Sequence, residues 1–455
     1  MAYCPSRRAL PFRWKGETMT LLDGPDANDL EGLAITASGV DRSGPTLVPV
    51  DRYISPAWMA IENEKVWPKT WQIACSLDHV ADPGDFYEYR AGWLSILVVR
   101  GQDGELRAFQ NACRHRGNAI CQGSGSGLDE LRCPYHRWAW TTEGMLREVP
   151  NRRGFGHIDN DEYALIPAKV DTWGRLVFVN LDTQAIGLGE WLEGIPDDLS
   201  WCPIDEYRCE ALVVSAMPAN WKVVAEGFSE TYHIQGIHRE MLGHVDDVDA
   251  PQQLWNRHGA SYQNYGEPSP RLGPNVEPEI VWDTWMNNMG QRLGVEPGTP
   301  MPEIPAGQTV KEVIAEGLVQ HHAAQGVDIS MHDTVRLTAI SQYNLFPNAS
   351  VLVMPDMISV LSSRPGLTPD DCQFVMMSLR RVAPGAPRTH PVTAEIDPDT
   401  DLGFVMNQDV AIMKTAQRGL HQPGLRHLAL SAEECRVINL HRNLDEWCGA
   451  TRTGD

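Results

Sequence analysis

Four potential metal ligands form two mixed pairs in the first half of the chain. Each pair joins one cysteine to one histidine, in Cys113-Arg-His115 and in Cys133-Pro-Tyr-His136. The pairs are separated by 17 residues, which gives the pattern C-x-H-(17)-C-x₂-H. A cysteine and a histidine two or three positions apart on a tight loop can bind one metal centre together. Two such loops therefore predict a metal centre with two thiolate and two imidazole ligands.

Two kinds of centre use this ligand set: a structural zinc ion and a Rieske-type [2Fe–2S] cluster. Zinc fingers commonly pair Cys with Cys and His with His, and they place the second pair on a helix. Here each pair is mixed, and both pairs lie between segments with strand-like patterns. A Rieske cluster needs two cysteines on one iron and two histidines on the other, which two mixed loops provide. The pattern favours the cluster, and a zinc-stabilised binding module is the alternative.

A second set of potential ligands follows further along the chain. Glu226, Glu230 and His233 have the i, i+4, i+7 spacing of one helix face. Such a charged stripe is also typical of a solvated helix surface. His238 comes five residues after His233, about 140° further around an ideal helix, so a regular helix would not direct both at one ion. Gly236 between them would allow a local break that brings them together.

The elements expected around these residues divide the chain into three parts. Residues 1–47 are rich in Gly, Asp, Ser and Pro and are predicted to form an N-terminal arm. Residues 48–185 contain short apolar or alternating runs separated by turn pairs, which predict an all-β domain. Residues 186–455 combine strand-like runs with helices expected at about Trp221 to Met241 and about Asn407 to Arg418. This combination predicts an α+β domain, an antiparallel sheet with helices in a helix-grip-like arrangement.

The composition excludes several classes of partner. The 455 residues include 60 acidic and 38 basic side chains, for a formal net charge of −22. Nucleic acid and anionic membrane surfaces require clustered Lys and Arg, so neither is expected. No apolar run reaches the length of about 18 residues needed for a membrane helix. The segment Met1–Lys15 lacks an apolar core, so we expect no signal peptide and a cytoplasmic protein with reduced cysteines.

The sequence around both ligand sets resembles that of one enzyme family. Three segments are similar to the cluster loops and the iron-binding helix of the Rieske non-heme iron ring-hydroxylating oxygenases, catalytic α subunit: Cys113-Arg-His115-Arg-Gly117, Cys133-Pro-Tyr-His136-Arg-Trp138 and Ala225-Glu-Gly-Phe-Ser-Glu-Thr-Tyr-His233-x₄-His238. The motifs are independent of each other and occur in the family's order. The resemblance covers roughly residues 50 to 445 and is weak from about 245 to 335.

The resemblance implies two iron cofactors and their ligands. It implies a Rieske [2Fe–2S] cluster bound by Cys113, His115, Cys133 and His136. It also implies a mononuclear non-heme Fe(II) bound by His233, His238 and a carboxylate from the C-terminal helix. The segment Asn407-Gln-Asp409, followed by Gln417-Arg-Gly419, resembles the family segment with that carboxylate and indicates Asp409. An acid at a helix N-terminus is the alternative role of Asp409, and Asp401 is the next candidate ligand.

Two positions depart from the common family pattern. Gly227 stands where the family usually has Asn, and Glu230 stands where it usually has Asp. In the family this carboxylate bridges the Rieske histidine of one subunit and the iron histidine of the next, so the resemblance implies that role for Glu230. Some family members that act on quaternary ammonium compounds share a Glu here. That substrate class therefore stays open.

The resemblance implies a terminal oxygenase that uses O₂ to hydroxylate, dihydroxylate or oxidatively demethylate a small substrate. The Trp and Met residues of segment 250–290 suggest a pocket or lid for an aromatic or apolar molecule, as in aromatic hydrocarbon catabolism, and a quaternary ammonium compound is the alternative. Without an NAD or flavin motif, electrons from NAD(P)H would arrive through a separate reductase, with or without a ferredoxin. The expected assembly is a homotrimer, with or without a β subunit.

Overall fold

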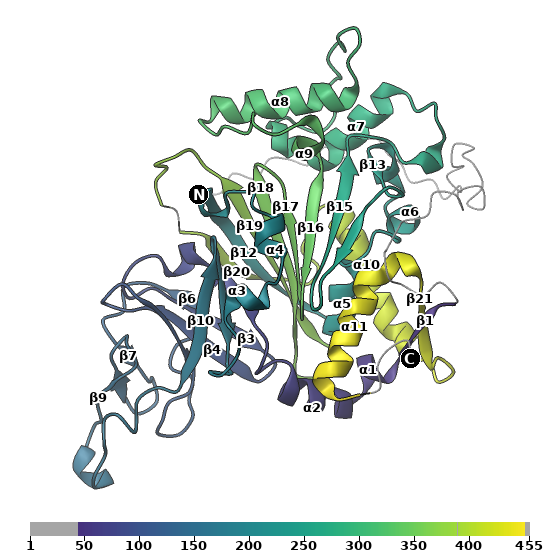
Figure 1. Ribbon diagram of the computed structural model, residues 1–455. Coiled ribbons are helices and arrows are strands. Elements are labelled where there is room, and N and C mark those ends of the chain that lie inside the picture. The colour runs from purple at the N-terminus through teal and green to yellow at the C-terminus, as the bar shows by residue number, and fades with distance from the viewer. Residues whose placement is uncertain (1–43, 389, 451–455) are drawn as a thin grey trace.

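The computed structural model describes residues 44–388 and 390–450, so nearly all of the expected arm, residues 1–47, lies outside the described residues. Figure 1 shows two connected parts, a β-rich part built from the first third of the chain and a larger part built around a long sheet. Both parts contribute buried side chains to one continuous core, which includes Trp67, Phe178 and Phe374. Among the described helices, none is long and apolar enough to span a bilayer.

The first part is all-β, as the sequence predicted. Its larger sheet has the spatial order β2 (Gln72–Ser76), β11 (Leu176–Asn180), β10 (Pro167–Trp173), β5 (Leu106–Gln110), β4 (Leu94–Arg100), β3 (Phe86–Ala91) and β6 (Ser124–Gly125). Its smaller sheet contains β7 (Leu131–Arg132), β8 (Ala139–Trp140) and β9 (Leu146–Glu148). The smaller sheet lies at the end of the molecule away from the long sheet (Figure 1).

The second part is built on a nine-stranded sheet. Its order is β13 (Val245–Asp246), β15 (Gly259–Tyr265), β16 (Ile340–Leu345), β17 (Ala349–Val353), β18 (Met357–Pro365), β19 (Cys372–Arg381), β12 (Tyr207–Met217) and β20 (Val392–Ile396), with β14 (Gln252–Leu254) paired to β15. The sheet is antiparallel except that β20 pairs parallel with β12. The antiparallel sheet expected from the sequence is thus present, with one parallel pair at an edge, because the chain crosses from β19 to the far side of β12.

Helices lie on this sheet and beyond one end of it (Figure 1). The helices close to the iron-binding motif are α5 (Trp221–Gly227), α6 (Ile234–Ile237), α10 (Phe404–Leu420) and α11 (Cys435–Cys448). A separate helical layer contains α7 (Pro278–Met289), α8 (Val310–Ala324) and α9 (Thr334–Thr338), and the short helices α3 (Leu188–Trp191) and α4 (Ile195–Asp198) connect the two parts. Trp282 and Trp285 are buried in the core of the helical layer, so they are packing residues. We had expected them to help build a pocket.

The N-terminal segment packs against the C-terminal end of the chain. It contains β1 (Thr46–Pro49), α1 (Asp51–Ile54) and α2 (Pro56–Lys65), and β1 pairs antiparallel with β21 (His427–Leu430). The division expected between residues 47 and 48 therefore falls inside a strand. This pairing joins residues almost four hundred positions apart, from Thr46 with Leu430 to Pro49 with His427, which no local pattern indicates.

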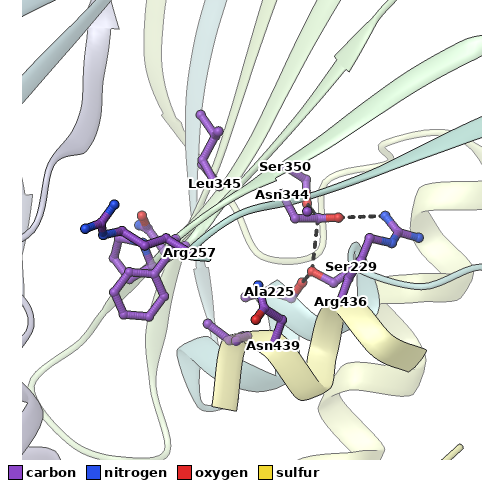
Figure 2. A pocket seen from close by; sticks show the side chains of 14 residues that line it. Ala225, Ser229, Arg257, Asn344, Leu345, Ser350, Arg436 and Asn439 are labelled. Carbon is purple, nitrogen blue, oxygen red and sulfur yellow. Dashed lines mark hydrogen bonds between the residues drawn. The ribbon is translucent and has the colours of Figure 1, made fainter. Parts of the chain in front are cut away.

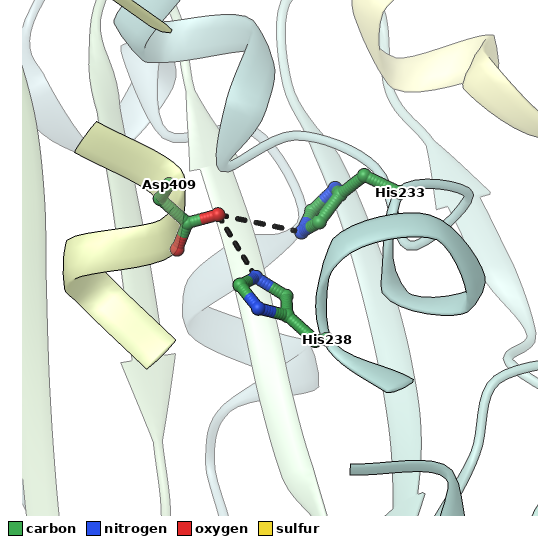
Figure 3. Close-up of side chains that lie close together, drawn as sticks. All are labelled: His233, His238 and Asp409. Carbon is green, nitrogen blue, oxygen red and sulfur yellow. Dashed lines mark hydrogen bonds and ion pairs between the residues drawn. The ribbon is translucent and has the colours of Figure 1, made fainter. Parts of the chain in front are cut away.

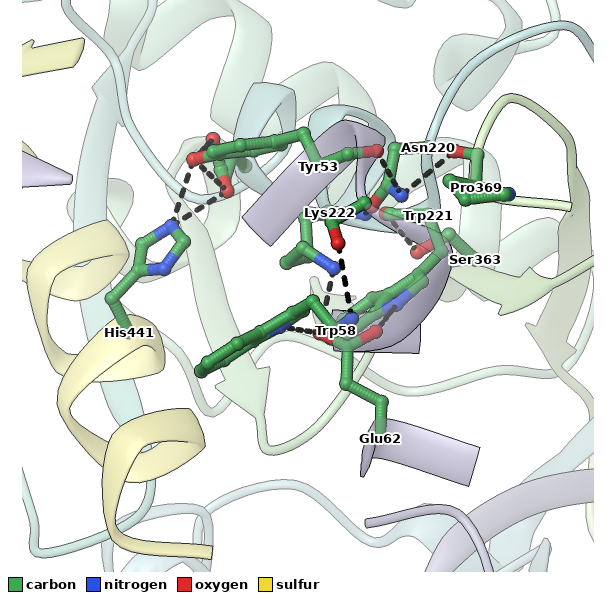
Figure 4. Close-up of polar contacts among 11 residues, drawn as sticks. Tyr53, Trp58, Glu62, Asn220, Trp221, Lys222, Ser363, Pro369 and His441 are labelled. Carbon is green, nitrogen blue, oxygen red and sulfur yellow. Dashed lines mark hydrogen bonds and ion pairs between the residues drawn. The ribbon is translucent and has the colours of Figure 1, made fainter. Parts of the chain in front are cut away.

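Buried polar contacts attach this segment to the start of α5 (Figure 4). The carboxylate of Glu62 accepts hydrogen bonds from Trp58 Nε1 at 2.7 Å, Trp221 Nε1 at 2.9 Å and Lys222 Nζ at 2.6 Å. Lys222 and Glu62 are both buried, and losing one partner of such a pair typically costs about 3–5 kcal/mol. Asn220 caps α5 by accepting a hydrogen bond from the Lys222 amide. The helix that leads to the iron-binding motif thus begins at a fixed place.

Candidate metal centres

The two Cys/His loops have the same backbone geometry. Gly117 N donates to Cys113 O at 2.9 Å, and Arg137 N donates to Cys133 O at 3.1 Å. The residue that closes each turn has a positive φ, 73° at Gly117 and 64° at Arg137. Each loop is therefore a five-residue turn that starts at its cysteine. Its histidine is the third residue in the first loop and the fourth in the second.

The loops place thiols inside and imidazoles outside. Cys113 and Cys133 are 4% and 1% exposed, whereas His115 and His136 are half-buried, with ring centroids 4.6 Å apart. Burial raises the pKa of the Cys113 thiol, and contact with Cys133 adds to the effect. This arrangement, with two inner thiols and two outer rings, fits the donor set of a [2Fe–2S] cluster with Cys₂ on one iron and His₂ on the other.

Aromatic side chains hold the outer imidazoles in place. Trp138 stacks on His115, with centroids 5.3 Å apart and planes 5° from parallel, and Phe155 meets the same ring edge-on. Tyr135 lies against His136 at 3.7 Å between centroids. The Nδ1 atom of His115 is buried and has no hydrogen-bond partner among the described residues. Because buried ring nitrogens are normally paired, this atom fits a metal-bound ligand.

The second motif does not form the continuous helix expected from Trp221 to Met241. Helix α5 ends at Gly227, residues 228–233 are non-helical, and α6 is a single turn followed by the 3₁₀ segment Arg239–Gly243. The prediction that Glu226, Glu230 and His233 share one helix face is therefore wrong. The helix breaks because the Phe228 carbonyl is bound by side chains from the sheet. Gly236 lies within α6 and is not the break.

The interruption brings both histidines to one carboxylate. His233 and His238 flank the single turn of α6 as its N-cap and C-cap. His238 Nε2 lies 2.9 Å and His233 Nε2 lies 3.9 Å from Oδ1 of Asp409 (Figure 3). One ligand atom from each of the three side chains lies within 4.8 Å of the others, which suits a shared ion. His238 and Asp409 are buried, and His233 is 24% exposed.

The position of Asp409 separates its two possible roles. It lies in the second turn of α10, beyond the first turn in which a carboxylate gains from the helix dipole. Asp401, the next candidate, accepts hydrogen bonds from Gly403 N at 3.0 Å and Asn407 Nδ2 at 2.8 Å in the loop before the helix. The geometry therefore favours Asp409 as the third ligand.

Neighbouring acceptors fix the tautomer of each histidine. Glu230 Oε1 lies 2.6 Å from His233 Nδ1, and Gln408 Oε1 lies 2.7 Å from His238 Nδ1. Because these oxygens accept, each Nδ1 carries a proton, and Nε2 is left as the nitrogen of each ring that can bind a metal. Gln408 was not among the sequence candidates, although it lies beside Asp409. Two imidazole nitrogens and one carboxylate, with no other protein ligand in the group, fit the facial set of a non-heme iron.

Protons compete with a metal ion for His238 in the metal-free site. Burial lowers the pKa of His238, but hydrogen bonding to Asp409 and the charge of Asp409 outweigh it and raise the pKa above its usual value. A histidine must be neutral at its ligating nitrogen, so metal binding here releases a proton. The affinity of the site for a metal should therefore fall as the pH drops through the raised pKa of His238.

The carboxylate of Glu230 contacts His233 of its own chain through both of its oxygens. Besides its contact with His233 Nδ1, its Oε2 accepts from His233 N at 3.0 Å. Its side chain is 12% exposed, and the next tyrosine, Tyr232, is 51% exposed. The expected contact of Glu230 with the iron histidine of its own chain is thus present, and its side chain is partly accessible.

Gly227 makes room for a methionine from α10. A Cβ atom at position 227 would lie 2.6 Å from the terminal methyl of Met413. Met413 is one helical turn beyond Asp409 and is 4% exposed. Gly227 stands where the family usually has Asn. The space beside this glycine is filled by Met413, from the same helix that carries Asp409.

We expect Gly227→Asn to destabilise the protein by about 1 kcal/mol, the low end of the usual cost of overpacking, because the atom it meets is the flexible end of the Met413 side chain. The double variant Gly227→Asn with Met413→Ala should recover part of that loss, because the shorter side chain vacates the space. Denaturant unfolding measures both changes. Gly419→Asn is the control, since a Cβ at this α10 glycine meets nothing within 4 Å. Equal effects at positions 227 and 419 would contradict the contact.

The other histidines have structural surroundings. His244, His258 and His322 are buried. His258, for example, lies between the Trp191 carbonyl, at 2.7 Å from Nε2, and the Phe346 amide, at 3.0 Å from Nδ1. Burial lowers the pKa of His258 to about 4, so it is neutral at physiological pH.

Family models match both parts of the chain. Residues 70–166 match the Rieske [2Fe–2S] domain, and residues 200–450 match the catalytic domain of the ring-hydroxylating alpha subunit. The first match contains both Cys/His loops, and the second contains both histidines of the second centre together with Asp409. The zinc-stabilised binding module is thereby set aside.

Individual relatives agree with the family models. The carnitine monooxygenase oxygenase subunit of Acinetobacter baumannii is 30% identical over 284 residues, which is 59% of this chain and 73% of the relative. The benzene 1,2-dioxygenase alpha subunit of Pseudomonas putida is 29% identical over 52% of this chain and 58% of the relative. The crystal structure of a quaternary ammonium Rieske monooxygenase with L-carnitine has the same fold, with a TM-score of 0.63, 19% identity and coverage of 90% and 96% of the two chains. The chain belongs to the ring-hydroxylating oxygenase alpha-subunit family, an oxidoreductase family, and carries a Rieske [2Fe–2S] domain ahead of its catalytic domain.

Proposed function

We propose that this protein hydroxylates a small organic molecule beside a mononuclear iron bound by His233, His238 and Asp409. The observation that carries the proposal is the convergence of two Nε2 atoms and one carboxylate oxygen within 4.8 Å. An iron bound there would supply the O₂ chemistry, and electrons come from a separate reductase. The residues of the chain hold the ligand atoms in place: Glu230 and Gln408 fix the two imidazoles, and α10 supplies the carboxylate.

We further propose that the cluster ligands are Cys113, His115, Cys133 and His136, and that electrons pass between subunits of a homotrimer. A head-to-tail contact would place the histidines of one subunit near Glu230 of the next, and such contacts close into rings when the rotation permits. The partial exposure of the Glu230 side chain supports this arrangement. A β subunit, an intermediate ferredoxin and a cytoplasmic location stay predictions.

A quaternary ammonium compound is the favoured substrate class. The carnitine monooxygenase relative supports it, and so does Glu230, which replaces the usual Asp as in some members that act on such compounds. An aromatic substrate is the second candidate, because the benzene dioxygenase relative covers a similar share of the chain. The reaction on a quaternary ammonium compound would be hydroxylation next to nitrogen, and the product would break down by losing the amine.

Turnover with a surrogate reductase separates the two classes. The iron-loaded protein, NADH and ¹⁸O₂ are incubated in parallel with carnitine, glycine betaine, benzene and naphthalene, and products are identified by mass spectrometry. We expect amine release from a quaternary ammonium compound with no cis-diol from the aromatics. Diol formation from an aromatic, with no amine release, would reverse the assignment of the substrate class. The His238→Ala variant is the control for background oxidation.

A further inference from the structure

The non-helical segment between α5 and α6 is bound through a single carbonyl group. Phe228 O accepts three side-chain hydrogen bonds, from Gln342 Nε2 at 2.5 Å, Asn344 Nδ2 at 2.9 Å and Ser350 Oγ at 2.7 Å. Asn344 also donates to Ser229 Oγ at 3.1 Å. The donors come from β16 and β17, two neighbouring strands of the large sheet. The sheet therefore fixes the backbone immediately before Glu230.

A buried arginine orients the amides that make these bonds. Arg436 Nη1 donates to Asn344 Oδ1 at 2.6 Å and to Gln342 Oε1 at 3.3 Å, and Arg436 Nε donates to Gln252 Oε1 at 2.9 Å. Figure 2 shows Asn344 between Arg436 and Ser229, bonded to both. By engaging the amide oxygens, the guanidinium turns the amide nitrogens of Gln342 and Asn344 toward Phe228. An amide rotated by half a turn would present an oxygen to that carbonyl and repel it.

The surroundings of Arg436 are unusual for a structural arginine. Its side chain is 2% exposed, and none of its hydrogen bonds to described residues goes to a carboxylate. Burial lowers its pKa to about 10, so it stays charged at neutral pH. Its stem passes over Gly259, where a Cβ would lie 3.0 Å from Arg436 Cγ. A buried charge hydrogen-bonded only to neutral amides is costly. The charge of Glu230 favours the charged guanidinium and offsets part of that cost, which connects Arg436 to the iron site.

We propose that Arg436 is a positioning residue for the iron site, acting through Gln342 and Asn344 to hold the Phe228–Glu230 backbone. Glu230 in turn holds His233 through two contacts, at 2.6 Å and 3.0 Å. The chain of contacts runs from α11 through β16 to the turn that ends at the first iron histidine. The inference rests on the proposed role of His233 as an iron ligand. It adds a residue whose hydrogen bonds go to Gln252, Gln342 and Asn344, and on which the charge of Glu230 acts through space.

Hydrogen exchange in metal-free protein tests the backbone part of this proposal. Arg436→Met keeps the length of the stem and removes the guanidinium. We expect faster exchange of the amides in segment 228–238, with exchange in the Rieske loops unchanged. Asn344→Ala removes one hydrogen-bond donor and leaves the arginine, so it should give a smaller change in the exchange of the same segment. It replaces Arg436→Met as the test if that variant does not fold. Arg426→Met, at an exposed arginine before β21, is the matched control.

Iron binding tests the second part of the proposal, that Arg436 affects the iron site. Fe(II) titration of Arg436→Met should show an affinity lower by roughly tenfold, as for other residues that orient metal ligands, and the EPR spectrum of the ferrous site with nitric oxide should broaden. Arg436→Lys should not rescue either property, because an ammonium cannot engage three amide oxygens in a fixed plane. Full rescue by Lys, or unchanged exchange and iron affinity in Arg436→Met and Asn344→Ala, would overturn the proposal. Iron retained by His233→Ala would instead refute the ligand assignment, and the exchange result would stand.

Discussion

His238→Ala should lose the mononuclear iron and all detectable turnover while its Rieske absorption and EPR signals stay intact. His238 Nε2 lies 2.9 Å from Asp409 Oδ1, so its removal leaves one imidazole and one carboxylate on two different elements. Such a pair binds Fe(II) weakly and without the facial geometry of the three-ligand set. Iron analysis should fall from about three atoms per chain to about two, because the cluster contributes two.

Two further variants make this result specific. Asp409→Ala should behave like His238→Ala, since it removes the ligand that both imidazoles face. His427→Ala, at an exposed histidine of β21, should keep iron and activity. Full turnover in Asp409→Ala would exclude it as the third ligand, and iron retained by His238→Ala would place the centre elsewhere.

The cluster loops were predictable because their geometry is local. Each cysteine lies within three residues of its histidine, and one backbone hydrogen bond closes each turn. The pattern of two mixed pairs therefore predicted two loops whose side chains the fold does bring together, with the two imidazole rings 4.6 Å apart. The arrangement of an all-β domain followed by an α+β domain was also confirmed, because short apolar strands and turn pairs are local signals too.

The path of the chain through the iron site was not predictable from the motif alone. The spacing of Glu226, Glu230 and His233 suits a helix, but Phe228 O is bound by Gln342 and Ser350, more than a hundred residues later. Contacts at that distance override local helix propensity. The sequence thus named three side chains that the fold brings together, His233, His238 and Asp409, but the helix it predicted is not what brings them together. Their role as iron ligands stays a prediction.

The predicted boundary of the N-terminal arm falls inside strand β1 for a related reason. The pairing of Thr46 with Leu430 is visible only once the chain is folded. The buried pair of Glu62 and Lys222 is likewise formed by residues 160 positions apart. Long-range contacts of this kind leave no periodic pattern in the sequence. The domain boundary was therefore predicted at the point where the composition changes.

Glu230→Gln should leave both metal centres loaded and slow electron transfer between them by roughly 10- to 100-fold. Glu230 Oε1 accepts from His233 Nδ1, and its other oxygen accepts from the His233 amide. An amide keeps one acceptor and replaces the other with a donor, so it cannot satisfy the same contacts and also accept from a histidine of a neighbouring subunit. Rapid-mixing absorption of the prereduced cluster, after addition of O₂ and substrate, measures the rate of cluster oxidation in a single turnover.

Mixed trimers identify the chain in which Glu230 acts. One chain carries His238→Ala and lacks the mononuclear iron, and the other carries Cys133→Ser and lacks the cluster. Each is expected to be inactive alone, and mixing should restore turnover if electrons cross between subunits. Adding Glu230→Gln to the Cys133→Ser chain, which supplies the iron site, should slow the mixture, because Glu230 contacts His233 of its own chain. Adding it to the His238→Ala chain should have a much smaller effect, and equal effects in both chains, or no recovery on mixing, would contradict the route between subunits.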